Sequence, residues 1–169
     1  MKDLERHLNA LQVVIIALVL IGAFSIQLFL HEQPCPLCFL QRLGMLGVGS
    51  GALMNLRFGP HKRYYGLSLL AAFFGGFVAL RQMALHACPG TKPFGVPFWG
   101  LSLYTWSFLI FACSVLFISI MLIFFKEGRN EKKGLHLLHK AAFLLLFSAA
   151  FGNIIDTAIL CGMSACVSP

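Results

Sequence analysis

Two cysteines separated by two residues, Cys35 and Cys38, form the pattern in this sequence that is best suited to redox chemistry. The short spacer lets both sulfurs meet in a small disulfide that exchanges readily with other thiols. Pro36 suits the first turn of a helix, because it lacks the amide hydrogen that would be unpaired there. Cys38 would then lie in that first turn, where the positive end of the helix dipole favours a thiolate. The pattern therefore predicts a reactive pair at the N-terminus of a helix.

Arg42 follows Cys38 by four residues, which places it on the same helix face and one turn deeper. A cation at that position can stabilise a thiolate or an oxyanion in a partly dry setting. The alternative is an interfacial arginine whose head group extends to lipid phosphates. The register with Cys38 favours a role in the reactive site.

The pair also has two non-catalytic interpretations, which stay open. It can be a structural disulfide on a loop. It can also contribute to a zinc site made of four thiolates, although such sites favour reducing compartments. The four cysteines of that site would be Cys35, Cys38, Cys161 and Cys166.

The elements that position these residues are predicted to be membrane helices. The chain has 169 residues, of which 59% are hydrophobic and 11% charged, and this composition is too apolar for a soluble domain. A membrane span needs about 20 mostly apolar residues. Five stretches qualify, at about residues 11–30, 37–56, 64–86, 101–125 and 137–160. We therefore predict an all-α, polytopic membrane helix bundle that forms a single domain.

Basic residues are concentrated on one side of the predicted bundle. They precede the first span and fill the connections after the second and fourth spans. By the positive-inside rule, the N-terminus is cytoplasmic and the C-terminus is periplasmic, as in a protein of the inner membrane. All cysteines except Cys113 then face the outer compartment, where disulfides persist. The basic connections lack a nucleic-acid recognition motif, so anionic lipid head groups are their expected neighbours.

The reactive pair resembles the signature of a known family. The sequence Pro-Cys-Pro-Leu-Cys at residues 34–38, followed by Gln-Arg at 41–42, is similar to that of the DsbB family of disulfide bond formation proteins. The resemblance implies a four-helix core that takes electrons from a periplasmic, DsbA-like thioredoxin-fold protein and passes them to a membrane quinone. This relay is already established as what keeps the bacterial periplasm oxidising.

Two further segments support the resemblance. Ala-Leu-Arg-Gln at residues 79–82, with His86, is similar to the end of the family's third span. Gly-Leu-Ser-Leu-Tyr-Thr-Trp at residues 100–106 is similar to the start of its fourth span. The likeness therefore runs over about residues 10–125, in the expected order.

The resemblance implies roles for individual residues. Cys35 and Cys38 would be the catalytic pair next to the quinone, which is ubiquinone or menaquinone. Arg42 would help to bind and polarise the quinone, and His86 is a candidate near it.

The sequence also departs from the family pattern. Typical members hold a second cysteine pair in a long connection between the third and fourth spans, whereas residues 87–100 contain only Cys88. An extra C-terminal span follows, and the spacing of Cys161 and Cys166 after it is similar to that of the compact second pair in shorter relatives. Gly162 would allow the tight turn of such a disulfide. We therefore expect Cys161 and Cys166 to be the catalytic pair that faces the partner, with pairing of Cys88 to one of them as the alternative.

Three functions follow from these patterns. The first is a quinone-dependent oxidoreductase that generates protein disulfides. The second is a quinone reductase of the vitamin K epoxide reductase type, although that type carries its Cys-x-x-Cys late in the chain and here the pair is early. The third is a non-catalytic membrane subunit with structural disulfides or bound zinc.

Overall fold

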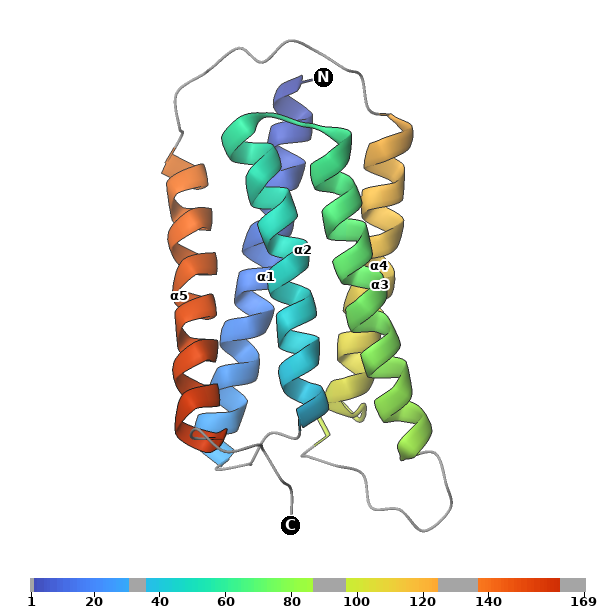
Figure 1. Ribbon diagram of the computed structural model, residues 1–169, viewed down its shortest axis with the longest axis vertical. Helices are drawn as coiled ribbons and strands as arrows, with labels where there is room; N and C mark the ends of the chain where they lie inside the picture. The colour runs from blue at the N-terminus through green and yellow to red at the C-terminus, as the bar shows by residue number, and fades with distance from the viewer. Residues whose placement is uncertain (1, 31–35, 87–96, 125–136, 162–169) are drawn as a thin grey trace.

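The computed structural model describes residues 2–30, 36–86, 97–124 and 137–161. Five helices account for most of these residues, and they lie side by side along one axis (Figure 1). This arrangement confirms the predicted all-α bundle. The helices are α1 (Lys2–Leu30), α2 (Pro36–Phe58), α3 (Lys62–Leu85), α4 (Leu103–Ile123) and α5 (Leu137–Cys161).

The surface of the bundle is apolar enough for a lipid environment. Leu70 and Phe77 on α3 and Leu116 on α4 are examples of large side chains that point away from the protein interior. Helices of this kind satisfy their own backbone hydrogen bonds, as lipid requires. α5 contains a shorter apolar stretch, Lys140–Ile155. Within the described part of the chain, four stretches are long and apolar enough to cross a membrane: Leu4–Gln27, Pro36–Phe58, Lys62–Leu85 and Leu103–Ile123.

Small residues let α2 and α3 approach closely. A Cβ atom added to Gly44 would lie 2.9 Å from the Cα atom of Gly75, so neither position has room for a side chain. Phe111 of α4 occupies the space above these two glycines. Close backbone contact of this kind is a usual way for membrane helices to associate. It fixes the start of α2 relative to the end of α3, where the site residues lie.

A buried polar cluster joins α1, α2 and α3 at the end of the bundle that holds the N-terminus. The Tyr65 hydroxyl donates to Glu5 Oε1 at 3.0 Å and accepts from Asn9 Nδ2 at 2.8 Å. Asn55 Nδ2 donates to Asn9 Oδ1 at 3.2 Å. The polar groups of α2 and α3 are therefore satisfied by those of α1, which lies between them in this network.

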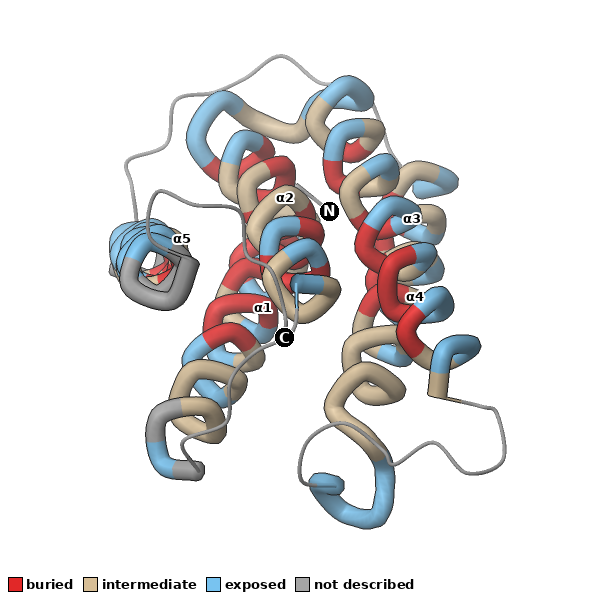
Figure 2. The backbone as a smooth tube through the Cα atoms, turned by 60° about the horizontal axis from the view of Figure 1, so that its bottom comes forward, coloured by how far each residue is buried: buried red, intermediate tan, exposed pale blue. Residues whose placement is uncertain are grey.

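The fifth helix packs on the side of α1 that faces away from α3 and α4 (Figures 1 and 2). Its contacts are with α1 and α2. The buried side chains of α5 recur at the spacing of one helix face. They are Ala142, Leu146, Ala149 and Asn153.

Candidate functional site

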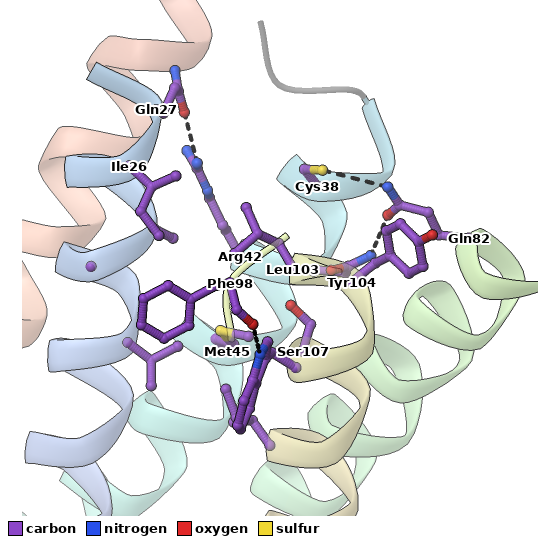
Figure 3. A pocket seen from close by; sticks show the side chains of 16 residues that line it. Ile26, Gln27, Cys38, Arg42, Met45, Gln82, Phe98, Leu103, Tyr104 and Ser107 are labelled. Atoms are coloured by element: carbon purple, nitrogen blue, oxygen red, sulfur yellow. Dashed lines mark hydrogen bonds between the residues drawn. The ribbon is translucent and has the colours of Figure 1, made fainter. Parts of the chain in front are cut away.

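Cys38 lies in the first turn of α2, which begins at Pro36 as the sequence predicts. Its side chain is partly buried and lines a cavity of about 330 Å³ between α1, α2 and α4 (Figure 3). The N-terminal amides of α2 lie around this position, so the helix dipole favours negative charge on the sulfur. Cys35, the other member of the predicted pair, lies outside the described residues.

Arg42 lines the same cavity as Cys38, as their four-residue spacing predicts. The side chain is 7% exposed, so it is enclosed by the protein and does not extend toward lipid head groups. Its Nη2 atom donates to Gln27 Oε1 of α1 at 2.7 Å (Figure 3). Its guanidinium carbon lies 4.6 Å from the ring centroid of Phe24 and 5.9 Å from that of Phe39. A buried cation is thus held by one amide oxygen and two aromatic faces.

Two buried glutamines link the third helix to the thiol. Gln41 Nε2 donates to Gln82 Oε1 at 2.6 Å, and Gln82 Nε2 lies 3.7 Å from Cys38 Sγ. Because the Gln82 carbonyl oxygen is occupied by Gln41, its amide nitrogen is directed at the sulfur (Figure 3). A donor in this position stabilises a thiolate.

A tight turn before α4 closes one side of the cavity. Phe98 and Leu101 exchange two backbone hydrogen bonds, of 2.9 and 3.2 Å, around Trp99 and Gly100. Both central residues have positive φ, 51° at Trp99 and 78° at Gly100, as a two-residue hairpin turn requires. Trp106 Nε1 donates to the Phe98 carbonyl oxygen at 2.9 Å, which ties the turn to α4. Phe98 therefore lines the cavity while Trp99 is exposed.

His86 lies just beyond the end of α3 and is not among the residues that line the cavity. Its Nδ1 atom is 2.9 Å from the carbonyl oxygen of Gln82, and its ring stacks on Tyr104 with centroids 5.3 Å apart. Tyr104 lines the cavity. His86, which is predicted to bind quinone, thus contacts two residues of the cavity lining, Gln82 and Tyr104, but does not line the cavity itself.

Of the other four cysteines, the structure describes the side chain of one. Cys113 is exposed on α4 and does not line the cavity. Cys161 is the last residue of α5, but its side chain lies outside the described residues, as do Cys88 and Cys166. Among the described side chains, no group of three or more His, Cys, Asp or Glu residues is arranged to hold a metal ion.

Sequence reasoning missed two residues of α1 that contact Arg42. Gln27 carries a weak signal, because it is a polar side chain in an apolar span. Phe24 carries none, since it is one of 17 phenylalanines in the chain.

The cavity combines an apolar lining with a few convergent polar groups. Apolar and aromatic side chains predominate, including Ile110 and Tyr104, and the donors of Arg42, Gln82 and Ser107 lie among them. Its volume is at the lower end of the range for small-molecule sites. These properties suit a flat apolar ring that carries hydrogen-bond acceptors and lies beside the Cys38 sulfur.

Comparison with known proteins identifies relatives of part of this chain. The sequence model of disulfide bond formation protein DsbB matches residues 5–94. The chain is 40% identical over 86 residues to the disulfide bond formation protein B of Chromobacterium violaceum, which covers 46% of this chain and 52% of that protein. It is 36% identical over 92 residues to the protein of the same name from Marinobacter nauticus, which covers 52% of this chain and 55% of that protein. The chain thus spans about half the length of the curated relatives it matches. No solved structure matches it.

Proposed function

The chain belongs to the DsbB family of disulfide bond formation proteins, and on that premise we propose that it is a membrane thiol–disulfide oxidoreductase. It reoxidises a periplasmic, DsbA-like thioredoxin-fold protein and passes the electrons to a membrane quinone. The observation that carries this proposal is that Cys38 and Arg42 line one cavity at the N-terminal end of α2. The location in the inner membrane, with the C-terminus in the periplasm, is part of the proposal and rests on the distribution of basic residues.

The residues of the cavity fit a quinone. Arg42 and Gln82 would donate hydrogen bonds to its oxygens, and Tyr104 and Phe98 offer apolar surface to its ring. When bound, a quinone accepts the two electrons and two protons that are released as a dithiol becomes a disulfide. Arg42 would favour negative charge beside Cys38, because its guanidinium is held inside the bundle by Gln27.

Cys38 is the thiol of the pair that lies next to the bound molecule. Its thiolate is stabilised by the N-terminal end of the α2 dipole and by the amide nitrogen of Gln82. Cys35 completes the pair and exchanges with the outer disulfide. In each exchange one thiolate attacks one sulfur of a disulfide and displaces the other as a thiolate, so that the number of electrons on the sulfurs is conserved.

We assign Cys161 and Cys166 as the pair that exchanges with the soluble partner. Direct exchange requires the two pairs to touch. The end of α5 and the start of α2 lie at the same end of the bundle (Figure 1), which supports this assignment. The alternative is that Cys88 takes part in the shuttle.

Anaerobic mixing of the purified protein with a short-chain quinone and a reduced DsbA-like protein tests the function. We expect one partner disulfide to form for each quinone reduced, measured by thiol titration and by quinone absorbance. Cys38→Ser should abolish both signals, and Cys113→Ser, which alters an exposed thiol outside the cavity, should retain them. Absence of quinone reduction would contradict the proposal. Quinone reduction by a small dithiol without oxidation of the partner would indicate the quinone reductase alternative.

A further inference from the structure

The fifth helix lies outside the part of the chain that matches the family, which ends at residue 94. None of the α5 side chains that the structure describes is among those that line the cavity. Its contacts are with α1 and α2. A physical link nevertheless runs from α5 to the cavity through one side chain of α1.

That side chain is Phe24. One face of its ring receives the Arg42 guanidinium, with 4.6 Å between the guanidinium carbon and the ring centroid. The edge of the same ring faces α5 at Gly152, where the space would hold a methyl group. A Cβ atom built on Gly152 would be 3.7 Å from Cζ and 3.8 Å from Cε2 of Phe24, which is ordinary van der Waals contact. The ring therefore lies between the arginine and α5, and a side chain at position 152 would meet it.

The same region of α1 holds Arg42 in a second way. Gln27 follows Phe24 by three residues, so both side chains lie on one face of α1. Gln27 accepts a hydrogen bond from Nη2, and Phe24 covers the planar face of the guanidinium. A planar cation held at its edge and at its face has one preferred orientation, whereas the hydrogen bond alone would allow rotation.

We propose that Phe24, which lies between Arg42 and Gly152 of α5, is a positioning residue that orients the Arg42 guanidinium in the cavity, so that the side chain at position 152 of α5 helps to set the affinity for quinone. The inference rests on the proposed function. It assigns a role to the fifth helix beyond carrying the C-terminal cysteines. It also predicts that substitution of Phe24 affects quinone binding only when Arg42 is present. A purely packing role of Phe24 would not depend on Arg42.

Direct binding of a short-chain quinone to the full-length protein provides the test. The chain has two tryptophans, and Trp106 lines the cavity, so its fluorescence in a Trp99→Phe background reports binding without turnover. Phe24→Leu should raise the dissociation constant about three- to thirtyfold, as expected for loss of a desolvated cation–π contact. Phe24→Tyr keeps the aromatic face and should bind as the parent does. Phe29→Leu is the matched control, because its ring is exposed on the same helix and does not line the cavity.

The helix itself is tested at Gly152. Gly152→Leu should displace the Phe24 ring and weaken binding in the same direction, while Gly152→Ala adds only an ordinary contact and should have little effect. Gly66→Leu is the control for the same change on a helix, because nothing lies within 4 Å of a Cβ atom there.

A double-mutant cycle separates positioning from packing. In an Arg42→Ala background, Phe24→Leu should cause no further loss of quinone binding. Additive losses would overturn the inference, and so would unchanged binding in Phe24→Leu or in Gly152→Leu. Should Phe24→Leu fail to fold, as judged by its helical signal, Phe24→Tyr and Gly152→Leu still decide the matter. If the parent protein binds no quinone, the proposed function fails and the inference fails with it. If the parent binds quinone but the losses from Phe24→Leu and Arg42→Ala are additive, only the inference fails.

Discussion

The amide nitrogen of Gln82 lies 3.7 Å from the sulfur of Cys38, although 44 positions separate the two residues in the chain. Gln82 is 1% exposed and its carbonyl oxygen accepts a hydrogen bond from Gln41, so the amide is held in one orientation. The end of α3 therefore contributes directly to the environment of the proposed reactive thiol.

We predict that Gln82→Leu slows the reaction of Cys38 with a small uncharged thiol reagent by about fivefold, because a long hydrogen bond to a thiolate contributes about 1 kcal/mol. Gln41→Leu should act in the same direction and more weakly, since it only orients Gln82. The rate is measured in a chain whose other cysteines are replaced by serine. Ser107→Ala, which removes a different polar group from the same cavity, is the control. An unaltered rate in Gln82→Leu would remove this residue from the site.

Arg42→Ala should weaken quinone use by about ten- to a hundredfold, because it removes a charged hydrogen bond worth roughly 1.5–3 kcal/mol. Arg42→Lys should restore only part of the loss, because lysine lacks the planar fork that contacts Gln27 and the aromatic rings. Steady-state kinetics with varied quinone measures both. Arg81→Ala is the control, since it removes an exposed arginine from the same end of the bundle. Equal quinone kinetics for Arg42→Ala and Arg81→Ala would contradict the assignment.

Gly44→Val should destabilise the bundle by about 1–3 kcal/mol, because its side chain would overlap the backbone of Gly75. The same change at Gly22, where a Cβ atom meets nothing within 4 Å, should cost much less. Unfolding in detergent, followed by the helical signal, compares the two variants. Equal midpoints would show that the close approach of α2 and α3 does not limit stability.

Cys161 and Cys166 should form a disulfide, and one of them should trap the soluble partner as a mixed disulfide when the other is changed to serine. Cys88→Ser should leave turnover largely intact. Non-reducing electrophoresis detects the trapped complex. The opposite pattern, with full activity in Cys161→Ser and Cys166→Ser but none in Cys88→Ser, would make Cys88 the shuttle.

An impermeant thiol reagent applied to intact cells after reduction should label Cys88, Cys161 and Cys166, because the basic connections predict that all three lie in the periplasm. Cys113, which lies within α4, is the internal control for protection by the membrane. Protection of Cys161 and Cys166 while Cys88 reacts would show that the fifth segment does not cross the membrane.

Local sequence patterns predict the helices of this protein well. Pro36 marks the start of α2, and the four-residue spacing of Cys38 and Arg42 places both on the cavity. Hydropathy is less informative about helix ends. α1 begins at Lys2, well before the apolar stretch at residue 11. Hydropathy does not detect its first turns because they are polar, and Asn9 in these turns is buried through hydrogen bonds to other helices.

The contacts across helices could not be predicted in the same way. Whether Gln27 meets Arg42 depends on the angle and height at which α1 packs on α2, and no local spacing encodes either. The same holds for Phe24, whose residue type is abundant and is compatible with both lipid and protein surroundings. Gln82 lies in a segment that the family resemblance picks out, but its orientation depends on Gln41.

The polar cluster of Asn9, Asn55 and Tyr65 has a consequence for how the bundle moves. Separating the helices at that end would leave several hydrogen-bonding groups without partners in lipid, at a cost of several kcal/mol. The opposite end has its own hydrogen bonds between helices, from Arg42 of α2 to Gln27 of α1 and from Gln41 of α2 to Gln82 of α3. Slow amide hydrogen exchange is therefore expected near Asn9 and Asn55, and also near Gln41 and Gln82. Because hydrogen bonds join α1, α2 and α3 at both ends, thiol exchange at Cys38 would take place without separation of these helices.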